Sequence, residues 1–428
     1  MSFDFKVNDA ATGNVVTTSQ ECGVSASCGL HSCVQQLDIS SYKSNIMLES
    51  IRNYGRMVST LYNCSFCDQL ELTDKGTNEG ISPSQQFNNN NVGIDIDGNN
   101  LQNTSYTIPL YCGLLQSQPV FLGQNGLKGL KLNINLAPSS NVVTRLTGSK
   151  TYTYELSNVR LIGQYYNPSP DEFSAGRIKS GFISSYEGIQ RGAGRSVGSD
   201  ELETAWSEAV DMGKGGANQP PYEYYSITGF VDSLNSNQSS HSLNLGLSKV
   251  RSVFMNYIPS SYINNFAYDG MAPRHFVDSD GNLAPVVNYK VSRSGVLFPN
   301  RFDTTTNARG YMANGTTNDR RSAIYQSLIN SVKVFYDNHY QSGNFSNAID
   351  SETQFYNYET DDKIVTKTAG LGMNFSNISS VGVDFSFSPL QLEIETLLTA
   401  SPVNHTIYLY AINKNTLMFS GNSVRVMN

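Results

Sequence analysis

GLKLNINLAP, residues 129–138, is the stretch that most clearly indicates the fold class. Its aliphatic residues occupy every second position, and polar residues fill the positions between them: Leu130, Leu132, Ile134 and Leu136 against Lys131, Asn133 and Asn135. A period of two places the aliphatic side chains on one face of a β-strand and the polar ones on the other. The stretch therefore predicts a strand with one buried and one solvated face.

Strand-like runs on both sides of this stretch predict a chain built mostly of β-structure. They are VQQLDI (34–39), SYTIPLYCGLL (105–115), a strand pair at 151–166, YYSITGFVD (224–232), SLNLGLSKVRSVFMNYI (242–258), VGVDFSF (381–387), LQLEIETLL (390–398), HTIYLYAIN (405–413), TLMF (416–419) and SVRVM (423–427). Charged residues make up only 15% of the chain and aromatic residues 11%, which is typical of strands and not of long helices.

Each half also contains one amphipathic helix pattern. In the first half, Asn45 is the expected cap, and the apolar stripe is Met47, Ile51, Tyr54, Val58 and Leu61. In the second half, Thr317 or Asn318 is the expected cap, and the stripe is Ile324, Leu328, Val332 and Phe335. The order of strand, helix, polar loop and closing strands is similar in both halves. It indicates a structural duplication, although chance among loop-rich β-proteins explains it as well.

The pattern divides the chain of 428 residues into four parts. Residues 1–32 are small, polar and aperiodic, and we interpret them as an N-terminal arm. Residues 33–166 and 223–428 each have the strand content of a β-sandwich. Residues 167–222 are rich in Gly and Pro, contain a short helix with the single Trp206, and are interpreted as the connection.

Charge and hydropathy exclude several classes of protein. The net charge is −7 and no Lys/Arg run occurs, so we expect no sequence-specific binding of nucleic acid. No apolar run reaches the roughly 18 residues that a membrane span needs. The first residues, MSFDFKVNDAATG, lack the basic and apolar regions of a signal peptide.

Four segments resemble the double jelly-roll major capsid proteins of the polinton-like virus, virophage and adintovirus group. They are residues 109–143, 152–168, 227–259 and 408–427. The motifs that carry the resemblance are Pro109-Leu110, the Gly129–Leu136 strand and the Tyr154–Leu161 strand, which correspond to the x-Pro-Leu, Gly-Leu-x-Leu-x-Ile-x-Leu and Tyr-x-Leu-x-Asn-Val-x-Leu strands of that family.

This resemblance implies both a fold and a function. The fold would be all-β, with two consecutive eight-stranded jelly rolls and short inserted helices. Three chains would form a pseudo-hexagonal capsomer that tiles the facets of an icosahedral DNA virus and contacts neighbouring capsomers, penton proteins and minor capsid proteins. The chain would belong to the virion, be assembled inside the infected host cell, need no cofactor and catalyse no reaction.

The cysteines offer one weak metal site. Cys64 and Cys67 have the spacing of half a zinc knuckle, and Cys28, His31 and Cys33 could supply the other half. A strong zinc signal pairs two Cys-x-x-Cys steps, and this chain has one. A disulfide and free thiols therefore remain as alternatives to a structural zinc, and free thiols are favoured.

Two acidic segments offer a weak cation site each. Asp95 and Asp97 precede Gly98, and Asp278 and Asp280 precede Gly281. Alternating carboxylates can bind Ca²⁺, but the third acidic position and the later Glu of an EF-hand are missing. Because Asp-Gly also favours tight turns, hairpin or loop tips are the preferred interpretation.

No catalytic motif is present, and two other functions remain as alternatives. A carbohydrate-binding or receptor-binding β-sandwich protein of a virion or cell surface is the first alternative. The second is a glycoside-active enzyme using Glu393 and Glu395, which share a strand face, although a solvated outer face is the preferred interpretation. His405 is expected at the surface or at a subunit seam.

Overall fold

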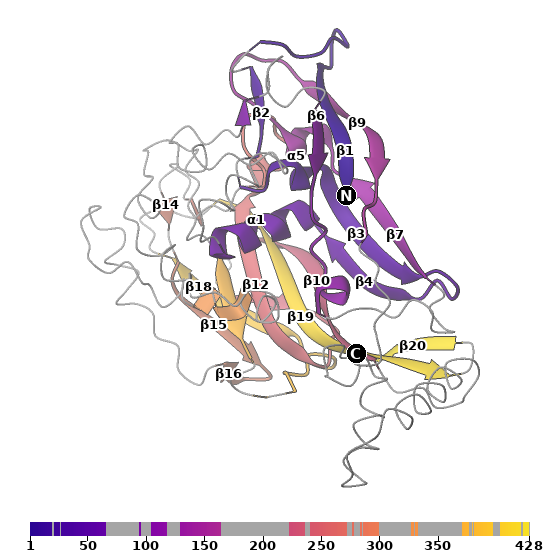
Figure 1. Ribbon diagram of the computed structural model, residues 1–428. Helices are drawn as coiled ribbons and strands as arrows, with labels where there is room; N and C mark the ends of the chain where they lie inside the picture. The colour runs from indigo at the N-terminus through magenta and orange to yellow at the C-terminus, as the bar shows by residue number, and fades with distance from the viewer. Residues whose placement is uncertain are drawn as a thin grey trace, which may run out of the picture.

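The computed structural model describes two halves that share one large sheet (Figure 1). The residues that it describes are 1–18, 21–25, 27–65, 94–95, 104–117, 129–163, 222–235, 240–271, 276–277, 283–284, 286–298, 327–328, 330–332, 370–375, 379, 381–396, 403–420 and 423–427. The predicted connection, apart from its last residue, Tyr222, lies outside these residues, as does Trp206, and the predicted boundaries of this connection stay a prediction.

Eight of the described strands form the sandwich of the second half. They are β10 (Tyr222–Leu234), β11 (Ser240–Leu243), β12 (Val250–Pro259), β15 (Val286–Arg293), β16 (Val296–Phe298), β17 (Leu371–Asn374), β18 (Leu390–Thr396) and β19 (His405–Ser420). The first strand pairs with the last, the second with the seventh, the third with the sixth and the fourth with the fifth, all antiparallel. This nested pairing is the connectivity of a jelly roll.

The nested pairs form two four-stranded layers, β10-β19-β12-β17 and β11-β18-β15-β16. One apolar cluster fills the space between them and draws side chains from both layers, among them Leu409, Met255, Tyr289 and Leu392. The predicted jelly roll is therefore confirmed in the second half by the strand pairings themselves.

The first half repeats the nested order less regularly. Its strands are β1 (Ser2–Asp9), β2 (Cys22–Val24), β3 (Val34–Ser41), β4 (Met47–Arg52), β5 (Ile94–Asp95), β6 (Thr104–Thr107), β7 (Leu130–Leu136), β8 (Val143–Arg145) and β9 (Tyr152–Arg160). β1 pairs with β9, β2 with β8 and β3 with β7, all antiparallel. Strand β4 pairs with β3 and also meets β10 of the second half, where Ser50 lies opposite Thr228.

Strands β12 and β19 have both faces buried. Ile407, Leu409 and Ala411 of β19 belong to the second-half core, whereas Tyr408, Tyr410 and Ile412 belong to the first-half core. This explains why HTIYLYAIN reads as a nearly continuous apolar run. Helix α1 (Tyr54–Ser65) lies against this sheet, where Asn256 of β12 donates hydrogen bonds to Arg56 O (3.1 Å) and Thr60 Oγ1 (2.6 Å).

The predicted first helix begins too early. Residues Met47–Arg52 form strand β4, and the helix begins at Tyr54. Asn53 separates the two elements with a left-handed φ of 53°, which Asn adopts more readily than most residues. In the second predicted helix, Leu328 and Val332 are helical and buried, but its predicted caps, Thr317 and Asn318, lie outside the described residues.

The interpretation of residues 1–32 as an arm is wrong. Strand β1 lies between β6 and β9, and its inward residues Phe3, Phe5 and Val7 are buried in the first-half core. The segment MSFDFKVND itself alternates with a period of two, which is the signal of a half-buried strand. The β1 segment is therefore part of the sandwich.

The smaller elements include further corrections. They are η1 (Gly29–Cys33), α4 (Gly113–Ser117), α5 (Ser139–Val142), η2 (Ser260–Tyr262), β13 (Phe276–Val277), β14 (Leu283–Ala284) and β20 (Ser423–Met427). The strand predicted at 105–115 thus ends at Thr107, and α4 follows. The strand predicted at 381–387 contributes one isolated bridge, between Val383 and Val250.

His405, predicted at the surface or at a subunit seam, is buried within the chain. Its ring packs 4.6 Å from the ring of Phe276, and its Nδ1 lies 2.7 Å from the carbonyl oxygen of Val403. Because a carbonyl can only accept, the neutral ring carries its proton on Nδ1. Burial lowers the pKa of His405 to about 4.

Candidate assembly surface and the junction of the two halves

Glu49 of β4 is the polar centre of the junction between the halves. It is buried, and its Oε1 accepts hydrogen bonds from the backbone N–H groups of Gly113 (2.9 Å) and Ile227 (2.7 Å). Its Oε2 accepts one from the N–H of Leu114 (2.9 Å). One carboxylate therefore joins β4, the first turn of α4 and β10 of the second half.

The environment of Glu49 sets its protonation. Burial raises the pKa of this carboxyl from 4.5 to about 7, against the opposing effect of the three N–H donors. Cys112 lies near Glu49. Burial raises the pKa of the Cys112 thiol well above its usual value, and the charge of Glu49 is a second cause of this rise. The junction is thus a closely packed and buried polar contact.

Close backbone approach at the junction requires glycine. A Cβ on Gly113 would lie 2.2 Å from the carbonyl oxygen of Tyr225, and one on Gly229 would lie 2.7 Å from that of Arg52. Real Cβ atoms do not come so close to backbone atoms. The two halves are therefore packed as one body at this seam.

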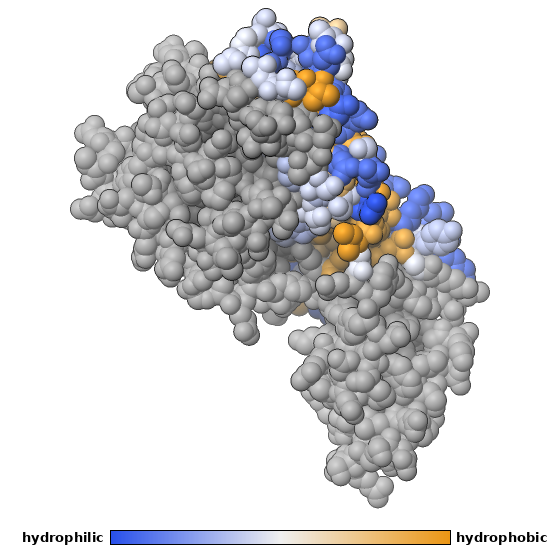
Figure 2. Space-filling view, turned by 45° about the horizontal axis from the view of Figure 1, so that its top comes forward, coloured by the Kyte–Doolittle hydropathy of each residue, from blue (hydrophilic) through white to orange (hydrophobic). Residues whose placement is uncertain are grey.

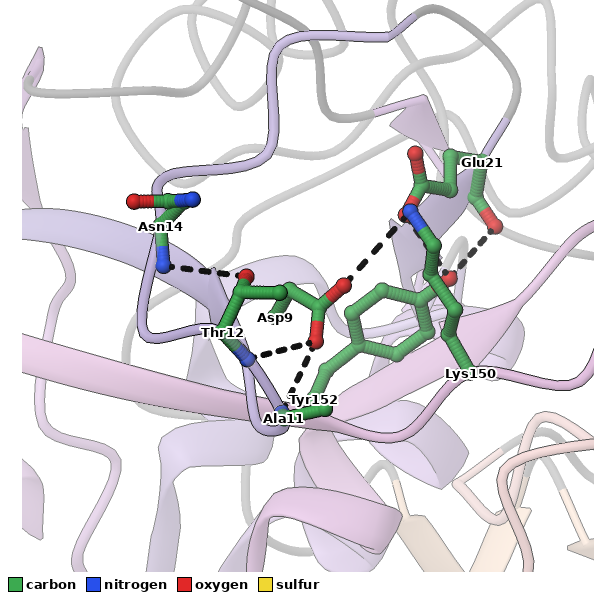
Figure 3. Close-up of polar contacts among 7 residues, drawn as sticks. All are labelled: Asp9, Ala11, Thr12, Asn14, Glu21, Lys150 and Tyr152. Carbon is green, nitrogen blue, oxygen red and sulfur yellow. Dashed lines mark hydrogen bonds and ion pairs between the residues drawn. The ribbon is translucent and has the colours of Figure 1, made fainter.

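A second polar cluster holds one end of the first half together (Figure 3). Lys150 Nζ lies 2.8 Å from Glu21 Oε1 and 3.5 Å from Asp9 Oδ2, and the hydroxyl of Tyr152 donates to the carbonyl oxygen of Glu21 at 3.3 Å. Asp9 Oδ1 also accepts from the N–H of Ala11 at 2.8 Å, which closes the turn after β1.

The charged side chains of this cluster have a structural role. The hydrogen bond to Glu21 is the main cause that raises the pKa of Lys150, and the hydrogen bond from Ala11 is the main cause that lowers the pKa of Asp9. Both shifts favour the charged forms near neutral pH. The cluster fastens the ends of β1 and β9 to the segment that leads into β2.

Exposed apolar side chains gather near the end of β9. Val159, Leu161 and Ile162 are 56%, 60% and 65% exposed. Figure 2 shows apolar residues among polar ones on the described surface, on the side of the molecule where Figure 1 places β1, β7 and β9. A group of exposed apolar side chains that are close together in the sequence is typical of protein contact surfaces. We name Val159, Leu161 and Ile162 the β9 apolar segment.

The candidate zinc site lies only partly within the described residues and stays a prediction. Cys28, His31 and Cys33 are buried around η1, and burial raises the pKa of both thiols far above the usual value. Cys64 lies in α1, whereas Cys67 lies outside the described residues. Among the described part of the chain, no group of three or more His, Cys, Asp or Glu side chains is placed to hold a metal ion, and Cys28, Cys33 and Cys112 are free thiols.

The acidic candidates are only partly described. Asp95 ends strand β5, and Asp97, Asp278 and Asp280 lie outside the described residues. Glu393 of β18 is half-exposed and lies 3.7 Å from Lys290 Nζ of β15, on the outer face of the sandwich. The sequence reasoning missed Glu49, because its partners lie far away in the chain.

Several solved viral structures are similar to this chain. The mavirus major capsid protein is 9% identical with a TM-score of 0.39, and the match covers all of this chain and 82% of that one. A chain of the Sputnik virophage structure is 11% identical with a TM-score of 0.42 over 100% and 81% of the two chains. The Faustovirus major capsid protein is 10% identical with a TM-score of 0.44 over 97% and 77%.

These TM-scores lie below 0.5, and the strand pairings of this chain establish its architecture. No protein-family model matches the sequence. No curated protein matches it either. Among the described helices, none has both the length and the apolar character needed to cross a bilayer.

Proposed function

We propose that this chain is the major capsid protein of an icosahedral DNA virus, with three copies forming a pseudo-hexagonal capsomer. The observation that carries the proposal is the nested strand pairing. It is complete in the second half and recurs in three pairs of the first. The family resemblance of the sequence also implies the role of a major capsid protein. The mavirus and Faustovirus proteins are named major capsid proteins.

The arrangement of the two halves suits a tile. Strand β4 continues the sheet of the second half, so the edge of β10 is covered by the other sandwich instead of being open to other chains. Two sandwiches fixed in one body give each chain two of the six corners of a pseudo-hexagon. Three chains related by a threefold axis complete the ring.

The proposed role is structural and not catalytic. Its contacts would be with two further copies, neighbouring capsomers, penton proteins and minor capsid proteins, in the virion. The β9 apolar segment is the described surface that best fits a contact between copies, because burial of exposed Val, Leu and Ile side chains favours association.

The first test is the solution mass of the purified chain by light scattering, with negative-stain images of the same fraction. We expect a mass of about three chains and hexagonal top views. A monodisperse monomer at all concentrations tested would sink the proposed capsomer.

A charge in the β9 apolar segment tests the contact surface. Leu161→Asp places a carboxylate in a surface that would become buried, so we expect loss of the trimer with an unchanged circular dichroism spectrum. Thr153→Asp adds the same charge at an exposed position within β9 and serves as the control. Equal masses for Leu161→Asp and wild type would remove this segment from the interface.

A further inference from the structure

A polar cavity lies on the seam between the two halves, beside the first turn of α1. Its volume is about 310 Å³. Residues of the first half, among them Gln35, Asn53 and Arg56, form one wall, and Asn264 and Tyr408 of the second half contribute to the other. Such a volume is at the lower end of small-ligand sites, and it accommodates a small ion or one side chain.

Arg56 carries a buried positive charge at this cavity. Its side chain is only 3% exposed, and its guanidinium carbon lies 4.2 Å from the ring centroid of Tyr408. Its Nη2 is buried and has no hydrogen-bond partner within the described part of the chain. A guanidinium cannot lose its proton in a protein, so a buried one requires compensation by an acceptor.

A buried carboxylate in the same region, that of Asp269, already accepts hydrogen bonds from other groups. Asp269 acts electrostatically on Cys28, as Arg56 does, which places both groups in the same region. Its Oδ2 accepts from the hydroxyl of Ser25 (2.9 Å) and its Oδ1 from the N–H of Met271 (3.0 Å). No ion pair joins it to Arg56 among the contacts of the described residues.

The amides that line the cavity add donors. Asn141 Oδ1 accepts from the backbone N–H of Asn264 at 3.0 Å. Because a backbone N–H can only donate, this bond fixes the side-chain orientation and leaves the NH₂ group of Asn141 to donate. Asn53 Oδ1 likewise accepts from Gln35 Nε2 at 2.8 Å. The lining thus presents N–H donors beside an unpaired cation.

We propose that this cavity binds a small oxyanion, either a free ion such as phosphate or a carboxylate, with Arg56 as its main ligand. A planar guanidinium matches the paired oxygens of carboxylate and phosphate groups. A ligand held by Arg56 and Asn141 of the first half would lie beside Asn264 and Tyr408 of the second half, which line the same cavity, and would so stabilise the junction. The inference does not depend on the capsid role.

The test is calorimetric titration of the full chain with inorganic phosphate and, separately, with acetate, at constant ionic strength in sodium chloride. We expect saturable binding of at least one of the two ions and a higher melting temperature in its presence. Tighter binding of phosphate would indicate a free phosphate as the natural ligand, and tighter binding of acetate would indicate a carboxylate.

Substitutions at Arg56 and Arg52 test whether the anion binds in this cavity. Arg56→Met should abolish it, and Arg56→Lys, which keeps the charge but loses the planar fork, should weaken it at least threefold. Arg52→Met removes the same charge from an exposed position four residues away and should bind like wild type. If Arg56→Met does not fold, Arg56→Lys decides the matter. No binding of either ion, or equal binding by wild type and the tested Arg56 variant, would overturn the inference.

Discussion

Glu49 shows how one residue can make the junction depend on pH. Burial raises its folded-state pKa from 4.5 to about 7. A carboxyl with a raised pKa binds its proton more tightly in the folded state. Its contribution to stability is therefore complete below about pH 4.5 and is lost as the pH rises through about 7.

We therefore predict a pH-dependent difference between wild type and Glu49→Gln, which cannot titrate. The free energy of unfolding of wild type, relative to the variant, should fall by about 3 kcal/mol between pH 4.5 and pH 8. Urea denaturation at a series of pH values measures it. A difference that rises with pH would mean that the three N–H donors outweigh desolvation.

The stability of wild type must be compared with that of Glu49→Gln, because the titration of His405 makes the protein more stable as the pH rises. Burial lowers its folded-state pKa to about 4. Its contribution to stability is present above about pH 6.5 and is lost as the pH falls toward 4. Both proteins contain His405, so this effect cancels in the difference.

The individual polar residues of the junction could not be predicted from the sequence. Glu49 and Arg56 stand in a stretch whose apolar spacing fits a helix, and nothing local distinguishes them from solvated charges. Their burial depends on Gly113, Ile227 and Tyr408, which only the folded chain brings close. His405 was mispredicted for the same reason, since Phe276 covers it.

At the scale of elements, β1 is the strand whose contribution is most easily measured. Phe5 is fully buried, and its ring lies 6.2 Å from that of Tyr154. We predict that Phe5→Ala lowers the free energy of unfolding by about 3–5 kcal/mol, because it removes a core aromatic and leaves a cavity. Urea denaturation measures the change.

Phe387→Ala is the matched control, because Phe387 is 91% exposed. It should change the stability of the isolated chain by no more than about 0.5 kcal/mol. If Phe5→Ala proves as mild as the control, residues 2–9 do not act as a core strand in solution.

Strands with one solvated face were predictable from their alternation, and the doubly covered β12 and β19 from their apolar runs, but the doubly covered β4 was not predictable. Strands β7, β10 and β18 follow their alternating patterns, and β3 follows a shorter one. Strand β4 buries Leu48, Glu49 and Ile51, so residues on both of its faces are covered and the period of two is hidden. Its spacing then fitted a helix better than a strand.

At the scale of the whole molecule, the two cores share strands β12 and β19, so we expect them to lose stability together. Leu409→Ala removes a side chain from the second-half core only. It should nevertheless reduce hydrogen-exchange protection of amides in β3 as well as in β15, as measured by mass spectrometry.

Val231→Ala serves as the control for this experiment, since Val231 is 48% exposed on the neighbouring strand β10. It should leave protection in both halves unchanged. Faster exchange confined to β15 and its neighbours in the Leu409→Ala protein would show that the halves open independently.

The shared wall β19 also determines when the chain can fold during synthesis. Residues 405–420 contribute side chains to both cores, and β10 and β12 each pair with them. Domains usually fold one after another as they leave the ribosome. Here neither core is complete until residue 420 has been translated, so the nascent chain has no finished sandwich with which to join a partner. Synthesis and association are thereby separated in time by the position of a single strand.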